Sequence, residues 1–160
     1  MDDNTILKNL VLPEFSGSTA LGSKKLIPNN FFQTYKTREV DPETYAKIND
    51  LRIKNPTFNF YFHDDLQMEK YMAANWQHRK IFEIYKNISI GAAKADIWRY
   101  CILYQYGGVY LDFDSSISFA LDALPDDANE IISFESNKLI SIISEKYTPD
   151  YLFLSNIIEN

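Results

Sequence analysis

The sequence predicts an α/β domain with a mainly parallel sheet flanked by helices. Strand-like and helix-like segments alternate along the 160 residues, which is the order of βα units. The hydrophobic fraction of 46% and the aromatic fraction of 15% are typical of a packed protein. A chain of this length forms one ordinary domain. We therefore expect one domain over residues 26–160, preceded by a flexible lead at residues 1–25.

Charge and composition exclude several classes of protein. The chain has 16 basic and 22 acidic residues and a net charge of −6, which argues against binding to nucleic acid or to an anionic membrane surface. No stretch reaches the roughly 20 apolar residues of a membrane span, and the first residues hold no apolar run of signal length. The single cysteine, Cys101, lies in an apolar helical pattern and is expected to be buried. We expect a cytoplasmic protein.

Local patterns predict the elements in order. An apolar run at 27–35 favours a first strand, and alternation at 58–63 favours a second. Asp41 before a proline, Asp64 in capping-box spacing and Ser89 are expected helix caps. The expected helices are 42–53, the segment after Asp64, 78–86 and the segment from Ser89 to the Gly107–Gly108 pair. Later strands are expected at 109–114, 130–134, 139–144 and 151–155.

Two aspartates in one expected strand carry the strongest chemical signal. Alternate side chains of a strand point to opposite faces, so Asp112 and Asp114 share a face with Tyr110 while the apolar residues between them face the core. Their carboxylates are then roughly 7 Å apart at ~3.3 Å per residue. Two ionised acids this close favour a cation. Carboxylate and phosphate oxygens suit Mn²⁺ or Mg²⁺, so we predict a divalent-metal site.

The same pair has other interpretations. Asp-x-Asp is common, and two incidental acids at a solvated strand end of a structural or interaction domain would explain it. Phosphohydrolases of the haloacid dehalogenase type also place Asp-x-Asp after an apolar strand, with the first Asp as nucleophile. That motif normally opens its domain, whereas 108 residues precede the expected strand here.

The surroundings of the pair resemble a known family. Residues 92–100, AAKADIWRY, and 106–114, YGGVYLDFD, resemble the DXD sugar-binding region of the initiation-type α-mannosyltransferases and, more distantly, of the clostridial glucosylating toxins. Residues 27–36, IPNNFFQTYK, are similar to that family's first strand, although Phe32 stands where the family often has His. Residues 55–65 resemble its Asn-Pro strand and the acidic cap that follows. The resemblance covers about 26–120 in the expected order.

This resemblance implies a fold and a set of site residues. The fold is the GT-A type, a Rossmann-like nucleotide-sugar-binding domain, and since only 46 residues follow Asp114 the family's later elements are expected to be cut short. The implied roles are nucleotide-pocket residues Gln33 and Thr34, donor-sugar residues Asp96 and Arg99, a ribose, sugar or metal-water contact at Asp112 and the metal ligand Asp114. Tyr110 either packs on the base or ribose or is a wall residue. Asp96 and Arg99, three apart on one helix, are neighbours in any case and also form a plausible surface ion pair.

The implied reaction is a metal-dependent hexosyl transfer, usually with retention of anomeric configuration. The donor is a UDP- or GDP-hexose and the acceptor a glycan, lipid or protein. Arg99, Asp112 and Asp114 are the expected catalytic residues, and Mn²⁺ or Mg²⁺ is the expected cofactor. The alternative is a catalytically silent nucleotide-sugar-binding module, or a fragment of a longer transferase, because both share every motif and differ only in turnover.

Overall fold

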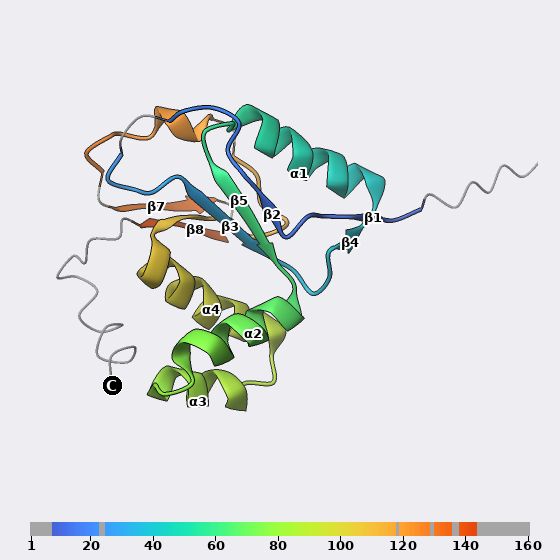
Figure 1. Ribbon diagram of the computed structural model, residues 1–160, viewed down its shortest axis with the longest axis vertical. Helices are drawn as coiled ribbons and strands as arrows, with labels where there is room; N and C mark the ends of the chain where they lie inside the picture. The colour runs from blue at the N-terminus through green and yellow to red at the C-terminus, as the bar shows by residue number, and fades with distance from the viewer. Residues whose placement is uncertain (1–7, 23–24, 118, 129, 136–137, 144–160) are drawn as a thin grey trace, which may run out of the picture.

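A six-stranded sheet forms the centre of the computed structural model, which describes residues 8–22, 25–117, 119–128, 130–135 and 138–143 (Figure 1). The strands lie in the order β2 (Phe15–Ser16), β5 (Asn59–His63), β3 (Asn30–Thr34), β6 (Gly108–Tyr110), β8 (Lys138–Ile143) and β7 (Glu130–Glu135). The three central strands, β5, β3 and β6, are parallel, and antiparallel strands extend the sheet on both sides. The predicted α/β class is confirmed.

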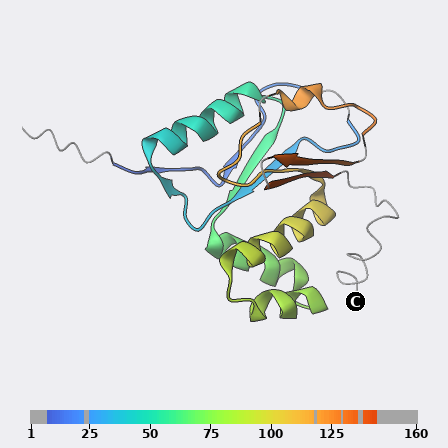
Figure 2. The same cartoon turned by 180° about the vertical axis from the view of Figure 1, so that it is seen from behind.

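Helices cover both faces of this sheet. Figures 1 and 2 show helices on both sides of the sheet. α1 (Pro42–Lys54) covers one face, and α2 (Asp65–Trp76), α3 (Lys80–Asn87) and α4 (Gly91–Tyr106) cover the other. A small antiparallel pair, β1 (Leu10–Val11) with β4 (Glu39–Val40), lies beside the start of α1. None of the helices in the described ranges is long and apolar enough to cross a membrane.

The helix boundaries follow the predicted caps, with one exception. Asp41 and Asp64 cap α1 and α2 through their side chains, and Asp64 forms the full capping box. Ser89 is not the cap of α4, because the helix begins after Ile90, which makes no side-chain capping bond. The predicted break at the glycine pair is confirmed: Gly107 and Gly108 both have positive φ.

Gly108 also explains how β6 comes to lie against β3. Its φ is 118°, a backbone conformation that side-chain-bearing residues rarely adopt. A Cβ at this position would collide with the backbone carbonyl of Asn30 at the start of β3. The absence of a side chain therefore lets the two parallel strands pair.

The core lies on both sides of the sheet, as the alternating pattern requires. On the α1 side, Phe31 and Val109 pack with Phe60 in one buried cluster. On the other side, Phe32 and Tyr110 pack against α2, α3 and α4 in a second cluster. Because neighbours along a strand point to opposite faces, this alternation fixes which face each residue of β3 and β6 reaches.

The described part of the expected flexible lead belongs to the packed domain. Residues 10–16 contribute β1 and β2, and β2 pairs with β5 at the edge of the main sheet. Leu12, between these strands, is fully buried with Val40 and Phe62. The expectation of a separate lead through residue 25 is therefore corrected for this stretch.

The strand expected at 109–114 is shorter than predicted. β6 ends at Tyr110, and its last ladder bond runs from the Leu111 amide to the Phe32 carbonyl (3.2 Å). The Ser115 amide then donates to the Asp112 carbonyl (3.0 Å), which closes a turn. The strands expected at 130–134 and 139–144 are confirmed as β7 and β8, and the one expected at 151–155 lies outside the described residues.

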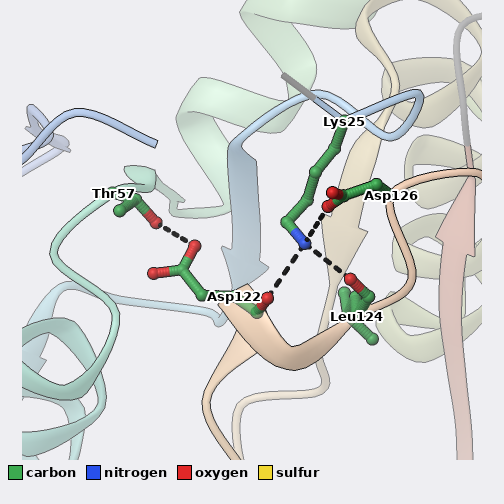
Figure 3. Close-up of polar contacts among 5 residues, drawn as sticks. All are labelled: Lys25, Thr57, Asp122, Leu124 and Asp126. Atoms are coloured by element: carbon green, nitrogen blue, oxygen red, sulfur yellow. Dashed lines mark hydrogen bonds and ion pairs between the residues drawn. The ribbon is translucent and has the colours of Figure 1, made fainter. Parts of the chain in front are cut away.

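After the turn the chain returns to the end of the sheet at which the parallel strands begin. A buried lysine holds it there (Figure 3). The short helix η1 (Leu121–Ala123) lies there. Lys25, whose side chain is 2% exposed, donates from Nζ to the carbonyls of Asp122 (2.9 Å) and Leu124 and to Asp126 Oδ1 (3.0 Å). The Thr57 hydroxyl donates to Asp122 Oδ1 (2.7 Å). We call these contacts the Lys25 anchor.

Candidate functional site

Four of the predicted site residues form one polar group on the α4 side of the turn. Arg99 donates from Nη2 to Asp96 Oδ1 at 2.7 Å, and its Nη1 lies 3.8 Å from Asp112 Oδ1. The Tyr110 hydroxyl donates to the same Asp112 oxygen at 3.0 Å. We call these residues, Asp96, Arg99, Tyr110 and Asp112, the Arg99 cluster. They come from α4 and from the end of β6, two consecutive elements that Gly107 joins.

Local sequence explains how a guanidinium group is held here. Trp98 is fully buried in the core beneath α4, which fixes the rotation of the helix and aims the next side chain at the end of β6. The Arg99 side chain is only 7% exposed, and its Cζ lies 5.0 Å from the Tyr110 ring centre and 5.2 Å from that of Tyr100. Cation–π contacts and two carboxylates offset the cost of burying this charge.

Burial also sets the protonation of the tyrosine in this cluster. Removal from solvent raises the pKa of the Tyr110 hydroxyl far above its ordinary value, and the charge of Asp112 raises it further, while Arg99 opposes this. The hydroxyl therefore stays protonated and keeps donating to Asp112. The Asp112 carboxylate is thus held between a tyrosine donor and a guanidinium group.

A pocket of about 520 Å³ lies on the α1 side of the turn. Gln33 of β3 and Asp114 of the turn both line it. Its apolar wall consists of Ile48, Leu51, Phe113 and Ile117. Its polar residues also include Thr44, Lys47, Asp50, Lys54, Ser115 and Ser116. We call this cavity the α1 pocket, and its size is that of ordinary small-molecule sites.

Gln33 and Thr34, predicted together for the nucleotide pocket, point to opposite faces of the sheet. Gln33 follows Phe31 on the α1 face and is 3% exposed. Thr34 is not among the residues that line the α1 pocket, and its hydroxyl donates to the His63 carbonyl at 2.7 Å. The structure therefore brings Gln33 together with Asp114 but gives Thr34 a partner in β5.

The two aspartates are related by a turn and not by a strand pleat. The predicted shared strand face, with its 7 Å spacing, is wrong because β6 ends at Tyr110. Asp112 is half-buried and belongs to the Arg99 cluster, whereas Asp114 is exposed and lines the α1 pocket. The turn thus links the two halves of the site.

The turn suits a divalent cation whose coordination a bound phosphate ligand would complete. No group of three or more His, Cys, Asp or Glu that could hold a metal occurs within the described residues. Mn²⁺ and Mg²⁺ are commonly bound through one or two carboxylates together with substrate phosphates. Asp112 and Asp114 are two such carboxylates, separated by one residue, so the donor set fits a metal that arrives with a phosphate ligand.

Sequence reasoning missed what supports the turn and closes the pocket. The rings of Tyr35 and Phe113 stack with centres 4.1 Å apart, and Phe113 meets the Phe62 ring edge-on at 5.9 Å. These contacts hold the middle of the turn against β3 and β5. Thr44 and Ile48, which share a helix face through i, i+4 spacing, close the other side of the pocket. The i, i+4 spacing of these two residues is the sequence signal that could have identified this wall of the pocket.

Comparisons with known proteins identify the family of this chain. Residues 41–137 match the model of the family described as "Glycosyltransferase sugar-binding region containing DXD motif". "Inositol phosphoceramide mannosyltransferase 3" of Schizosaccharomyces pombe is 32% identical over 61% of this chain and 27% of that protein. "Mannosyl phosphorylinositol ceramide synthase SUR1" of Saccharomyces cerevisiae is 30% identical over 76% of this chain and 31% of that protein. This chain therefore spans less than a third of either relative.

A solved structure shares the fold. The "PaToxG Glycosyltransferase" matches with a TM-score of 0.53 and 18% identity over 74% of this chain and 55% of that one. The expected GT-A type fold is thereby confirmed. The family match covers more than half of the chain and includes both sides of the turn. The chain belongs to the glycosyltransferase family whose sugar-binding region contains the DXD motif.

Proposed function

We propose that this chain binds a nucleotide-diphosphate sugar and transfers its hexose to an acceptor, with mannose as the first candidate sugar. The observation that carries the proposal is the arrangement of the Asp112–Asp114 turn. It joins a buried, charged polar cluster on one side to an open pocket that contains Gln33 on the other. The names of the two fungal relatives, both mannosyl transfer enzymes, favour mannose.

The donor lies across the turn in this proposal. Its sugar contacts the Arg99 cluster, where Asp96 is 57% exposed and has carboxylate oxygens that can accept sugar hydroxyls. Its nucleoside occupies the α1 pocket, where apolar residues receive the base and the Gln33 amide provides both donors and an acceptor. Its diphosphate then lies beside Asp114. Thr34, which points to the opposite face of the sheet, contributes by holding β3 against β5.

A divalent cation, Mn²⁺ or Mg²⁺, is part of this proposal. Asp114 would bind it directly, with Asp112 as a direct or water-mediated ligand. When bound, it neutralises charge on the leaving diphosphate. Because the protein has a net charge of −6, its own charges offer little to neutralise the diphosphate in place of a metal ion.

The chain's own residues prepare the donor sugar. Arg99 and Tyr110 fix the Asp112 carboxylate from two directions, so that its contacts with ribose or sugar need no rearrangement on binding. The buried guanidinium group also adds positive charge near the anomeric carbon's leaving group. We propose retention of the anomeric configuration.

A lipid-linked acceptor is the first to test. Both named relatives carry the words inositol phosphoceramide or phosphorylinositol ceramide in their names, so inositol phosphoceramide is our first candidate, ahead of a glycan or a protein. A cytoplasmic location stays a prediction.

A thermal-shift panel tests the donor. GDP-mannose, UDP-glucose and UDP-galactose are each added with and without Mn²⁺. A donor present at 100 times its dissociation constant adds about 2.7 kcal/mol to the free energy of unfolding, and we expect one donor to do so only with Mn²⁺. Release of the nucleoside diphosphate with inositol phosphoceramide then tests turnover. Binding without turnover would support a silent donor-binding module, and the absence of any shift would contradict donor binding.

A further inference from the structure

The α1 pocket contains a cation that the predicted site does not include. Lys47 of α1 lines this pocket together with Gln33 and Asp114. Thr44 and Ile48, its neighbours on the helix, line the same pocket, so one face of α1 forms the wall. Lys47 therefore lines the same cavity of about 520 Å³ as the acid of the turn.

The direction of α1 decides which end of the pocket Lys47 reaches. The helix connects the carboxyl end of β3 with the amino end of β5, and these two strands are parallel neighbours (Figure 1). It therefore runs opposite to the strands and begins near their carboxyl ends, where the turn lies. Lys47 is in the second turn of α1. Lys54 also lines the pocket, but it lies about 10 Å further along the axis, at ~1.5 Å per residue.

The present partner of Lys47 is easily exchanged. Its Nζ lies 2.8 Å from Glu43 Oε1 in an i, i+4 pair whose side chains are 73% and 78% exposed. Exposed pairs of this kind contribute little to stability, because water screens them and both side chains lose freedom. A phosphate group with several negative charges therefore competes well for the ammonium group of Lys47.

We propose that Lys47 binds the diphosphate of the nucleotide-sugar donor from the α1 side of the turn. This rests on the proposed function and adds a residue to it. A lysine ammonium group is a compact charge with three donors and is a common phosphate ligand. Asp114 needs a cation before it can approach a phosphate, whereas Lys47 approaches it directly. The diphosphate is thus held between a metal on the turn and an amine on the helix.

Calorimetric titration of the whole chain with GDP and with UDP, each in the presence of Mn²⁺, tests this. Lys47→Gln should weaken the affinity for the bound nucleotide about tenfold, the loss of one charge-assisted contact. Its affinity for the matching nucleoside should not change. Lys54→Gln, in the same pocket and in a similar i, i+4 pair with Asp50, should weaken nucleotide affinity less than Lys47→Gln does. Lys80→Gln removes the same charge from the exposed start of α3 and should have no effect.

Two further variants keep the test decisive if Lys47→Gln is poorly folded, which its thermal unfolding will show. Lys47→Arg should keep most of the affinity, and Glu43→Gln should increase it because a competitor is removed. Equal affinities for Lys47→Gln and Lys80→Gln, with tight binding by the wild type, would overturn this inference and leave the proposed function standing. A wild type that binds neither GDP nor UDP would overturn both.

Discussion

Two cationic side chains are almost fully buried near opposite ends of the parallel strands, and their partners differ. The Lys25 side chain, 2% exposed, is surrounded by two backbone carbonyls and the Asp126 carboxylate. The Arg99 side chain, 7% exposed, is paired with the carboxylates of Asp96 and Asp112. Its Nε has no hydrogen-bond partner within the described residues.

From this difference we infer that Lys25 holds the fold and that Arg99 binds a ligand. An ammonium group has three donors, and the Lys25 anchor uses all three inside the protein. A guanidinium group has five, and the Nε donor of Arg99 is not used within the described residues. Burying a charge is costly unless its partners offset it. We therefore expect changes at Lys25 to act on folding and changes at Arg99 to act on binding.

Lys25→Met breaks the first half of this comparison and should have the largest effect. Methionine fills the space but leaves the carbonyls of Asp122 and Leu124 without their donor. We expect the free energy of unfolding to fall by about 3 kcal/mol, measured by urea denaturation, with donor affinity of the folded protein unchanged. Lys80→Met is the control. A loss below about 1 kcal/mol would show that the anchor is not structurally important.

Arg99→Lys tests the second half. Lysine keeps the charge but cannot present the planar fork to Asp96 and Asp112. We expect affinity for the nucleotide sugar to fall about 30-fold, close to 2 kcal/mol, with a smaller loss of stability than Lys25→Met causes. Affinity for the nucleoside diphosphate without the sugar should change little. An equal loss for both ligands would show that Arg99 does not act at the sugar.

Much of this fold was predictable because its signals are local. The helix caps, the period-2 strands and the glycine pair each depend on a few neighbouring residues, and the elements appear where these signals lie. The extent of β6 was not predictable, because alternation continues through Asp114 in the sequence while the chain turns at residues 113–114. That turn depends on Phe113 packing against Tyr35 and Phe62, which are distant in sequence.

The site shows the same division. The pairing of Asp96 with Arg99 follows from helix spacing and is present, and the resemblance to the family supplied Asp112 as its neighbour. Gln33 and Thr34 were expected to act together, yet adjacent strand residues must point to opposite faces. Lys47 could not be assigned, because only the crossover of α1 over the sheet brings it near Asp114.

Asp114→Asn sharpens the comparison by changing the exposed side of the turn. Because Asp114 is exposed, we expect stability to change by no more than about 0.5 kcal/mol. The Mn²⁺ dependence of donor binding should disappear, an effect of about tenfold or 1.4 kcal/mol. Titrations of donor with and without Mn²⁺ measure it, with Asp127→Asn, the same change at an exposed residue that does not line the α1 pocket, as the control. An unchanged response to Mn²⁺ would remove Asp114 from the metal site.

Tyr110→Phe should have the smallest effect near neutral pH. It removes the hydrogen bond to Asp112 (3.0 Å) and keeps the ring beneath Arg99. We therefore expect the free energy of unfolding to fall by about 1 kcal/mol. Its effect on stability should change sign with pH. Burial raises the pKa of Tyr110, so the folded protein retains a proton that the unfolded chain releases near pH ~10. Tyr110 therefore stabilises the fold fully below that pH and destabilises it progressively above.

Urea denaturation between neutral and alkaline pH measures this. Each tyrosine that cannot ionise in the folded state lowers stability by about 1.4 kcal/mol per pH unit above pH ~10. Burial also raises the pKa of Tyr71 and Tyr85, so the wild type and the variant both lose stability there. The variant should lose it less steeply, by one tyrosine's share. Tyr100→Phe, which changes the other ring beside Arg99 and keeps the Tyr110 hydroxyl, is the matched control. Parallel curves for Tyr110→Phe and the wild type would mean that the Tyr110 hydroxyl ionises freely and does not hold Asp112.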